Sequence, residues 1–388
     1  MKIGYDFDGV FHKNVSKPDG LGERNYVEST NLIEFCEILD KIRKEIKEGH
    51  EIFIISRGKR EVVIDNLKKL FVYKLFDENN IITDLGEKNI LKSEIIKEKN
   101  IDEFFDDSVF NIHDINKQKK KKELKTRLYL VNPEINSYKR IKSNNIKLLS
   151  YNVNWQNMIS INPTIKECTK KDLCASNINK LIKDELPLDF ILLQEFDNED
   201  ILLNGLLDFD LFRTKSGKEY MVTLVNKKYK VIKVIDGEFE KGRPFLVVFL
   251  IMDDKKICLI NVHMAHNKEY LRDLKLIEDK IKEIKENKEI NIDEYRIIIG
   301  GDFNEEIGTD IPFCGKNMHN FFKKLTCCIY STHMNEDNSI LKYIKGKSID
   351  HILDSQEEPV YTLNITPLDE NKLIPASDHL ALYSELTK

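Results

Sequence analysis

Two aspartates, Asp6 and Asp8, follow the first apolar segment of the chain in the sequence Tyr5-Asp6-Phe7-Asp8-Gly9. A pair of carboxylates at a strand end can divide the work of phosphoryl transfer, because one attacks phosphorus while the other moves the proton of the leaving group. Asp-x-Asp pairs also occur in ordinary loops, so the pair alone does not establish a site. The interpretation therefore depends on the polar residues that follow in order.

Three further polar groups follow or open later segments in the first third of the chain. Ser56 follows the apolar segment 51–55, Lys92 opens a segment with helical spacing, and Asp106-Asp107 follow a third apolar segment. If the apolar segments are parallel strands, their polar ends meet at one edge of a sheet. An anionic nucleophile that approaches an anionic phosphate also needs a cation and a lysine to offset the repulsion.

This order resembles the haloacid-dehalogenase superfamily of phosphatases over residues 1 to about 135. The resemblance implies a Rossmann-like α/β domain in which Asp6 is the nucleophile and Asp8 the general acid/base. It also implies that Ser56 and a lysine bind the phosphoryl group, with Lys92 preferred and Lys88 as the alternative. The short spacings leave no room for a cap domain, so we expect an open, capless site that suits bulky substrates such as polynucleotide ends. The resemblance implies a Mg²⁺ site, with Mn²⁺ as a substitute, formed by Asp6, Asp8, Asp106 and Asp107.

A second set of polar residues closes apolar segments in the rest of the chain. Asparagine and carboxylate oxygens are ligands that a hard divalent cation prefers. A carboxylate beside an imidazole fixes one ring nitrogen so that the other faces the reaction. Six segments that each end in a metal-ligand or proton-transfer residue indicate a second site. The residues are Asn152, Glu195, His263, Asp302 with Asn304, Asp350, and Asp378 with His379.

These segments resemble the exonuclease/endonuclease/phosphatase superfamily, which has the DNase I-like fold, over residues 146–388. The resemblance implies that Glu195 is the principal ligand of a second Mg²⁺ or Mn²⁺ ion, and that Asn152 and Asp378 lie close to this metal.

The same resemblance assigns the residues that act on the phosphate. It implies that Asp302 and Asn304 orient the attacking water and the phosphate. It also implies that His379, paired with Asp350, takes part in water-mediated attack, and that His263 contacts the scissile phosphate.

Four other residues leave two interpretations open. Arg243 and Tyr220 lie on segments that could reach phosphate. His266 could line the site or be an ordinary loop histidine. Trp155, the only tryptophan, could stack on a base or pack in the interior.

The apolar pattern predicts two domains, 1–135 and 146–388, joined by a polar, turn-rich linker at 136–145. Alternating strands and helices in the first domain are typical of a parallel sheet wrapped by helices. Many strands with two helices in the second domain favour an α+β, four-layer arrangement, in which helices cover a two-sheet sandwich. The expected strands are 2–7, 51–55, 80–83, 103–105, 127–131, 146–151, 189–194, 221–226, 245–252, 256–263, 296–300, 348–353 and 381–386, and the expected helices are 31–47, 60–70, 91–99, 171–185 and 268–286.

Composition excludes several classes of protein. The 61 basic and 66 acidic residues give a net charge of -5, which argues against a strongly basic protein that wraps nucleic acid. No apolar run approaches the roughly 18 residues of a membrane span, and no secretory signal is present, so we expect a soluble, intracellular protein of the cytoplasm or nucleus without a membrane partner. The seven cysteines lack a Cys-x-x-Cys pair, so we expect core or surface thiols rather than a zinc site or disulfides.

Two sets of phosphoester chemistry in one chain favour a bifunctional, Mg²⁺-dependent enzyme of nucleic-acid processing. The C-terminal domain would cleave a phosphodiester in DNA or RNA, and the N-terminal domain would remove a terminal phosphate. One alternative is a phosphoesterase of small molecules such as nucleotides, inositol phosphates or lipid headgroups. Another is a binding protein with one inactive site. The oligomeric state stays open.

Overall fold

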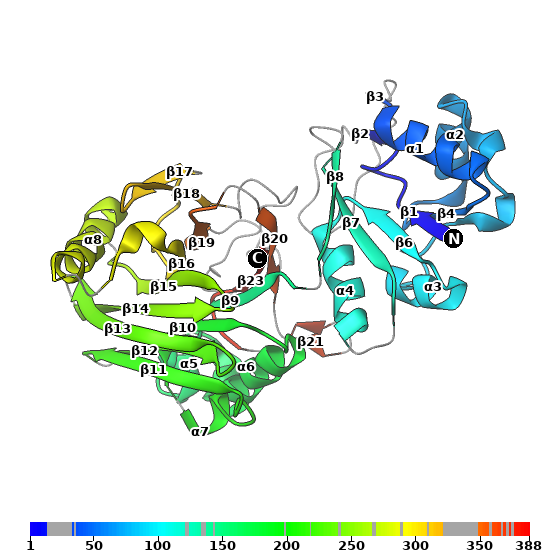
Figure 1. Ribbon diagram of the computed structural model, residues 1–388. Helices are drawn as coiled ribbons and strands as arrows, with labels where there is room; N and C mark the ends of the chain where they lie inside the picture. Colours follow the sequence, from blue (N-terminus) through cyan, green and yellow to red (C-terminus); the bar gives the residue numbers. More distant parts are fainter. Residues whose placement is uncertain are drawn as a thin grey trace. The chain divides into compact units, whose positions relative to one another are not determined.

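The computed structural model describes residues 1–13, 33–34, 36–120, 124–132, 137–142, 144–197, 199–217, 219–239, 242–265, 269–287, 290–308, 310–320, 348–356, 359–365, 368–369, 372–373 and 376–388. The chain divides into two compact units, residues 1–144 and 145–388 (Figure 1). No helix within the described ranges is long and apolar enough to cross a membrane.

The first unit contains eight strands and four α-helices in its described residues. The strands are β1 (Lys2–Tyr5), β2 (His12–Lys13), β3 (Ile33–Glu34), β4 (Glu51–Ile55), β5 (Ile81–Ile82), β6 (Glu103–Asp106), β7 (Arg127–Asn132) and β8 (Ser137–Arg140). The helices are α1 (Cys36–Lys47), α2 (Arg60–Lys69), α3 (Lys92–Lys99) and α4 (Val109–Lys120), with short 3₁₀ turns at η1 (Tyr73–Leu75) and η2 (Glu78–Asn80).

Six of these strands form one sheet in the order β5-β4-β1-β6-β7-β8. The strands from β5 to β7 are parallel to their neighbours, so their carboxyl ends lie at one edge. Tyr5 of β1 packs in one core with Leu39 of α1 and Leu67 of α2, which places both helices on the same face of the sheet. The parallel sheet with covering helices matches the arrangement that the sequence predicts.

Two segments of the first unit differ from the sequence-based expectation. Residues 33–34, expected to be helical, pair with β2 as the short strand β3, and the described helix begins at Cys36. The helix α4 was not expected, because its polar residues weaken the apolar pattern.

The segment expected as a linker, 136–145, contains the strand β8, which runs antiparallel to β7. Its Tyr138 ring meets the rings of Phe105 and Tyr129 edge-on at 5.2 and 5.9 Å. A single aromatic side chain anchors this strand, so no apolar periodicity marks it. In the sequence, the boundary between the two units lies between Asn144 and Asn145.

The described residues of the second unit form two large sheets and a small hairpin. Its strands are β9 (Ile146–Asn152), β10 (Phe190–Phe196), β11 (Phe209–Ser216), β12 (Glu219–Asn226), β13 (Lys230–Phe239), β14 (Arg243–Met252), β15 (Lys255–His263), β16 (Arg296–Asp302), β17 (Asp310–Phe313), β18 (Lys316–Asn320), β19 (Asp350–Asp354), β20 (Pro359–Ile365), β21 (Leu368–Asp369), β22 (Lys372–Leu373) and β23 (Ala381–Leu386). Its helices are α5 (Trp155–Met158), α6 (Leu173–Asp184), α7 (Glu199–Leu202) and α8 (Tyr270–Glu286), with 3₁₀ turns at η3 (Lys166–Thr169) and η5 (Ile292–Glu294).

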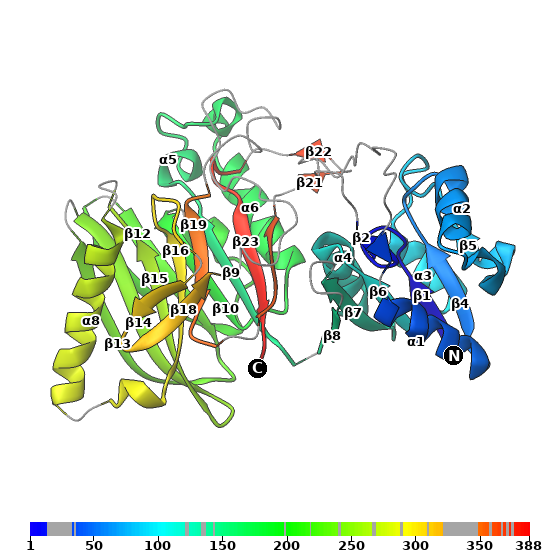
Figure 2. The same ribbon diagram turned by 90° about the horizontal axis from the view of Figure 1, so that it is seen from above.

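The two large sheets form the sandwich that the sequence predicts. Their orders are β11-β12-β10-β9-β23-β20 and β13-β14-β15-β16-β19-β18-β17. Leu192 of β10 in the first sheet shares a buried cluster with Val248 of β14 and Ile298 of β16 in the second sheet. Figure 2 shows α8 on the outer side of one sheet and α6 on the outer side of the other.

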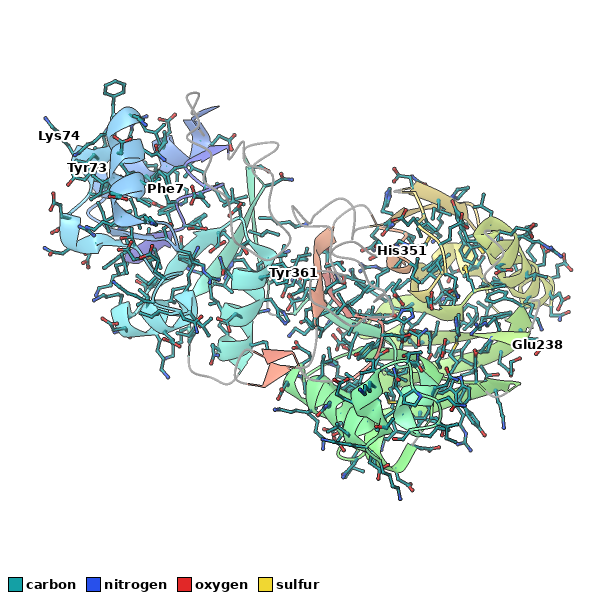
Figure 3. The ribbon with its side chains drawn as sticks, turned by 180° about the vertical axis from the view of Figure 1, so that it is seen from behind. Phe7, Tyr73, Lys74, Glu238, His351 and Tyr361 are labelled. Atoms are coloured by element: carbon teal, nitrogen blue, oxygen red, sulfur yellow. A yellow bond between two sulfur atoms is a disulfide. The ribbon has the colours of Figure 1, made fainter. Side chains whose placement is uncertain are left out.

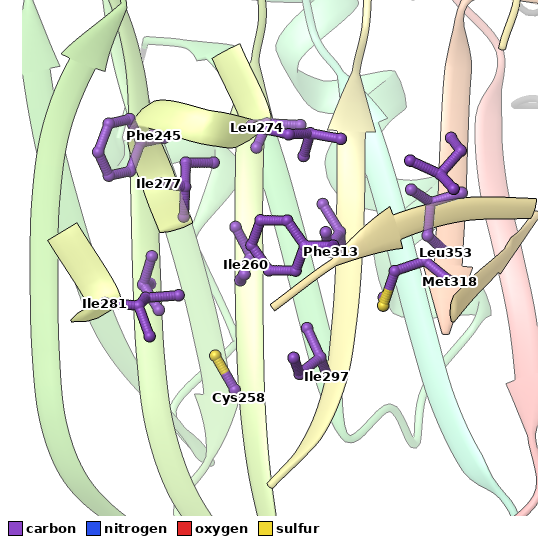
Figure 4. Packing of buried hydrophobic residues seen from close by; sticks show 14 of the residues in the cluster. Phe245, Cys258, Ile260, Leu274, Ile277, Ile281, Ile297, Phe313, Met318 and Leu353 are labelled. Carbon is purple, nitrogen blue, oxygen red and sulfur yellow. The ribbon is translucent and has the colours of Figure 1, made fainter. Parts of the chain in front are cut away.

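The helix α8 buries an apolar stripe against the second sheet. Leu274, Ile277 and Ile281 recur at helical spacing and belong to the same cluster as Phe245 of β14 and Ile260 of β15 (Figure 4). Burial of each such side chain stabilises the fold by about 1.5–3 kcal/mol. The helix therefore stabilises β15 and β16, the strands that end at His263 and Asp302.

A buried polar link joins the two sheets beneath their carboxyl ends. The Nε2 atom of Gln194 in β10 donates to Oδ1 of Asn261 in β15 at 2.7 Å, and Nδ2 of Asn261 donates to the carbonyl of Val222 in β12 at 2.9 Å. Both side chains are fully buried.

The expectation for the cysteines was wrong for one pair. Cys168 and Cys174 form a disulfide, and both are buried. Cys168 lies in η3 and Cys174 in the first turn of α6, and the short connection between these elements brings their Cα atoms to 5.5 Å. Cysteine spacing does not reveal such a connection. Of the other described cysteines, Cys258 is buried and Cys314 is partly buried.

Candidate active sites

The first candidate site lies at the carboxyl edge of the parallel sheet. Asp6 follows β1 and Asp106 ends β6, and these strands are neighbours. Lys92, at the start of α3, places its Nζ atom 2.7 Å from Asp6 Oδ2 and 2.8 Å from Asp106 Oδ2. Burial acts to lower the pKa of Lys92, but the carboxylates of Asp106 and Asp6 outweigh it and raise this pKa. The lysine is therefore charged and balances two buried carboxylates.

Three carboxylates of this edge could hold a metal ion. Asp6, Asp106 and Asp107 each offer an oxygen within 4.8 Å of the others. Asp8 is also buried, at 7% exposure. Gly9 has a φ of +73°, and a Cβ atom there would lie 2.0 Å from Asp107 Oδ2, so only glycine fits beneath this carboxylate.

The other residues predicted for this site divide between the edge and the surface. Ser56 follows β4, next to β1, and its Oγ accepts from the backbone N–H of Gly58 at 3.0 Å. Lys88, the alternative lysine, is exposed. Asn111 of α4 was not predicted, yet its Nδ2 donates to both carboxylate oxygens of Asp106 at 3.0 and 3.2 Å. Phe7, between the two leading aspartates, is buried against Phe11 (Figure 3).

The second candidate site lies where strands of both sheets of the sandwich end. Asn152 of β9 lies beside Gln194 of β10, so Glu195 follows at the same edge. His263 of β15 pairs with Asp302 of β16, and Asp302 pairs in turn with Asp350 of β19. Strand pairing therefore brings these predicted residues together.

Asn152 connects two carboxylates of the site. Its Nδ2 atom lies 2.9 Å from Asp302 Oδ2 and 3.3 Å from Glu195 Oε1. Burial raises the pKa of Glu195, an effect that His263 partly offsets. Burial acts in the same direction on Asp302, but His379, His263 and the Asn152 amide outweigh it and lower the pKa of Asp302. Asp302 is thus ionised at neutral pH.

His379 is held between two carboxylates. Its Nδ1 atom lies 2.8 Å from Asp350 Oδ2, and its Nε2 atom lies 3.8 Å from Asp302 Oδ2. Burial acts to lower the pKa of His379, but Asp350, Asp302 and Asp378 together raise it to about 10. The ring is therefore an imidazolium at neutral pH, with Nε2 on the side of Asp302.

His263 lies in a second charged group. Its Nδ1 atom lies 3.1 Å from Glu219 Oε2, and its Nε2 atom lies 3.6 Å from Glu195 Oε1. The Nη1 atom of Arg243 donates to both oxygens of Glu219 at 2.6 and 2.7 Å and lies 2.9 Å from His263 Nε2. Burial acts to raise the pKa of Glu219, but His263 and Arg243 outweigh it and lower this pKa. Glu219 was not predicted, and Arg243 was an open alternative.

Asp378 and Asn304 are fixed by neighbouring amides. Asp378 Oδ1 accepts from Asn154 Nδ2 at 2.8 Å. Asn304 has a φ of +52°, and its Nδ2 donates to the carbonyl of Met264 at 2.7 Å. Its backbone N–H donates to Asp302 Oδ1 at 2.7 Å. Asn154 was not predicted.

Two other residues, His351 and Trp155, have more ordinary positions. His351 is buried, with contacts at 3.2 Å to Asn320 Nδ2 and at 3.0 Å to the carbonyl of Glu305, so it supports the loop after β16 (Figure 3). Trp155 is half-buried at the start of α5. His266 lies outside the described residues.

The donor set of the second site fits a hard divalent cation. Glu195 and Asp378 are carboxylates with partly exposed side chains. Glu195 accepts a hydrogen bond from the Asn152 amide, and Asp378 accepts one from the Asn154 amide. Oxygen ligands of this kind suit Mg²⁺ or Mn²⁺ rather than softer metals. The three aspartates of the first site are also oxygen donors.

No family model matches the chain. The chain is 31% identical over 277 residues to an uncharacterized protein, L684, of Acanthamoeba polyphaga mimivirus, a match that covers 62% of this chain and 50% of that protein. The chain thus spans about half the length of this curated relative.

Several solved structures are similar to part of the chain. D. rerio TDP2 complexed with single-strand DNA product is 15% identical, with a TM-score of 0.48, over 63% of this chain and 100% of that one. Truncated Caenorhabditis elegans TDP2 is 15% identical, with a TM-score of 0.49, over 64% and 99%. The human Nocturnin catalytic domain with bound sulfate anion is 15% identical, with a TM-score of 0.45, over 63% and 93%. At such scores, the function has to be argued from the geometry of the sites.

Proposed function

We propose that residues 145–388 form a divalent-metal-dependent phosphodiesterase that acts on nucleic acid. The observation that carries this proposal is the position of His379, whose imidazolium lies between Asp350 at 2.8 Å and Asp302 at 3.8 Å. A cationic ring beside an ionised carboxylate supplies both a positive charge for a phosphate and an acceptor for the proton of a water.

The side chains divide the work as follows. Asp302, whose pKa is lowered, orients a water and accepts its proton. His379 holds its proton at Nε2 and stabilises negative charge that develops on the phosphate. Arg243 adds positive charge next to Glu195, and His263 Nε2 lies 3.6 Å from the same carboxylate.

A cation would be held by Glu195 and Asp378, with Asn152 close to it. When bound, Mg²⁺ or Mn²⁺ would neutralise phosphate charge and polarise the bond that breaks. Asn152 would orient Glu195 for this task.

We further propose that residues 1–144 form a haloacid-dehalogenase-like phosphatase. The contact of Lys92 with both Asp6 and Asp106 favours this second function, because a buried cation there would offset the negative charge of a phosphate beside these carboxylates. Asp6 would attack phosphorus, Asp8 would move the proton of the leaving group, and Asp106 and Asp107 would help to hold Mg²⁺. The Ser56 hydroxyl would bind the phosphoryl oxygens.

A nucleic-acid substrate would give both activities one target. Cleavage of a phosphodiester leaves a terminal phosphate, which is a substrate for a phosphatase without a cap domain. Covalent linkage would raise the local concentration of that end near the first site. The competing substrate class is small phosphoesters.

The test uses the full chain and two variants, Glu195→Gln and Asp6→Asn, with Mg²⁺. The substrates are end-labelled single- and double-stranded DNA and RNA, with and without terminal phosphates, and a set of small phosphoesters. We expect strand cleavage to be lost only in Glu195→Gln and phosphate release only in Asp6→Asn. Inertness toward every polymer, with turnover of a small phosphoester, would overturn the nucleic-acid proposal.

A further inference from the structure

Asn154 joins the start of a helix to one carboxylate of the second site. Its Oδ1 atom accepts from the backbone N–H groups of Gln156 at 3.1 Å and Asn157 at 3.3 Å, which caps α5. Its Nδ2 atom donates to Asp378 Oδ1 at 2.8 Å. Asp378 lies 224 residues further along the chain, so this bond closes a long loop at the edge of the sheet.

The orientation of the Asn154 amide is determined by its partners. The two backbone N–H groups can only donate, so they require the oxygen of the amide on their side. The nitrogen is then directed toward Asp378 and toward the hydroxyl of Thr164 at 3.3 Å. A flipped amide would set donors against donors on one side and an acceptor against a carboxylate on the other.

The backbone at this position also selects asparagine. Asn154 is buried, with 6% exposure, and has a φ of +52°. Asparagine tolerates this left-handed region better than most residues because its side chain bonds the local backbone. Asparagine therefore satisfies three requirements at this position: it caps the helix, it tolerates the backbone conformation, and it donates a hydrogen bond to Asp378.

We propose that Asn154 is the positioning residue for Asp378. By occupying Oδ1, it leaves Oδ2 of Asp378 as the oxygen available to the cation, and it prevents the carboxylate from rotating away from Glu195. This inference rests on the proposed function, since it requires a cation at the second site. It predicts that loss of the amide donor weakens cation binding even when the helix cap is retained.

The variants Asn154→Ser and Asn154→Ala separate the two roles of the side chain. Serine can still accept from the backbone as a helix cap, whereas alanine cannot. Neither residue has an amide donor, and both are strained to a similar degree by the positive φ at this position. Thr164→Val is the matched control, because it removes the other partner of Nδ2 and leaves Asp378 bonded.

Cation binding can be read without activity. Trp155 is the only tryptophan of the chain and follows Asn154 directly, so light absorbed by tryptophan alone excites a reporter next to this site. Tb³⁺, an oxygen-seeking substitute for Mg²⁺, gives sensitised emission when bound close to that ring. Titration of the full chain with Tb³⁺, and displacement by Mg²⁺, yields the affinity of the second site.

We expect Asn154→Ser and Asn154→Ala to need about tenfold more Tb³⁺ than the wild type, the size of effect that follows loss of a hydrogen bond to a charged group. Thr164→Val should stay within about twofold. Activity should show a higher Mg²⁺ requirement, with a rate at saturating Mg²⁺ close to that of the wild type.

Two other outcomes are distinguishable. If Glu195→Gln abolishes the emission while Asn154→Ser binds Tb³⁺ like the wild type, then the metal site stands and Asn154 is only a helix cap. If the wild type gives no sensitised emission, or emission that Glu195→Gln does not change, then the proposed metal site fails and the role of Asn154 fails with it.

Discussion

The ammonium group of Lys92 lies 2.7 Å from the carboxylate of Asp6, and both side chains are buried in the first unit. The lysine is the first residue of α3. Substitution of Lys92 tests the importance of this contact.

Lys92→Met should destabilise the first unit by about 3–5 kcal/mol, because it leaves Asp6 and Asp106 as buried, uncompensated charges. Chemical denaturation followed by circular dichroism measures this. Lys88→Met removes an exposed lysine nearby and should change stability by less than about 0.5 kcal/mol. If both variants unfolded alike, Lys92 would have no special electrostatic role. The double variant Lys92→Met with Asp6→Asn should recover part of the loss.

His379 should stay protonated to high pH in the metal-free protein. Its pKa rises from 6.5 to about 10, so the stability that it contributes is fully present below pH 6.5 and is lost as the pH rises toward about 10. Asp350→Asn should bring the pKa down and remove this dependence. NMR titration of the histidine ring protons, compared between wild type and Asp350→Asn, measures the shift. An ordinary pKa in the wild type would contradict the assigned role of Asp350.

Arg243→Met should lower kcat/KM of the second site by about 10–100-fold, because it removes a positive charge beside His263 and Glu195. Steady-state kinetics on whichever phosphodiester proves active measures the loss. Arg213→Met is the control, since Arg213 forms an exposed pair with Glu199 at 2.7 Å on the same unit. Equal effects of the two substitutions would indicate a general charge effect rather than a local one.

Trp155 provides a test of the substrate class. Because this half-buried ring follows Asn154, bases of a bound oligonucleotide should quench its fluorescence. The measurement uses Glu195→Gln protein, so that no cleavage occurs. An oligomer without bases but with the same phosphate charge is the control. Equal quenching by both would point to recognition of phosphate alone.

Several features of the fold could be predicted from the sequence because they rest on apolar periodicity. Strands such as 51–55 and 381–386 are mostly apolar and match β4 and β23. The edge strand β13 was missed because its side chains alternate between partial and full exposure and include lysines and acidic residues. β8 was missed because one tyrosine anchors it.

Some members of the second site could be predicted because they end strands. Asn152, His263 and Asp302 each close an apolar segment, and the sequence reveals them for that reason. Glu219 and Arg243 are the first residues of β12 and β14, which run antiparallel to β10 and β15. Their starting ends meet the carboxyl ends of those partners, a fact that depends on strand direction and not on composition.

The buried bond between Gln194 and Asn261 bears on how the second site resists thermal motion. Glu195 and Asn152 belong to one sheet, and His263 and Asp302 belong to the other. Apolar side chains between two sheets allow small sliding movements, since contact between methyl groups has little directional preference. A directional hydrogen bond, in contrast, is lost after a shift of about 1 Å. The hydrogen bond between Gln194 and Asn261 therefore resists sliding of one sheet against the other. It keeps the residues that would bind the cation in a fixed position relative to the residue that accepts the proton of the water.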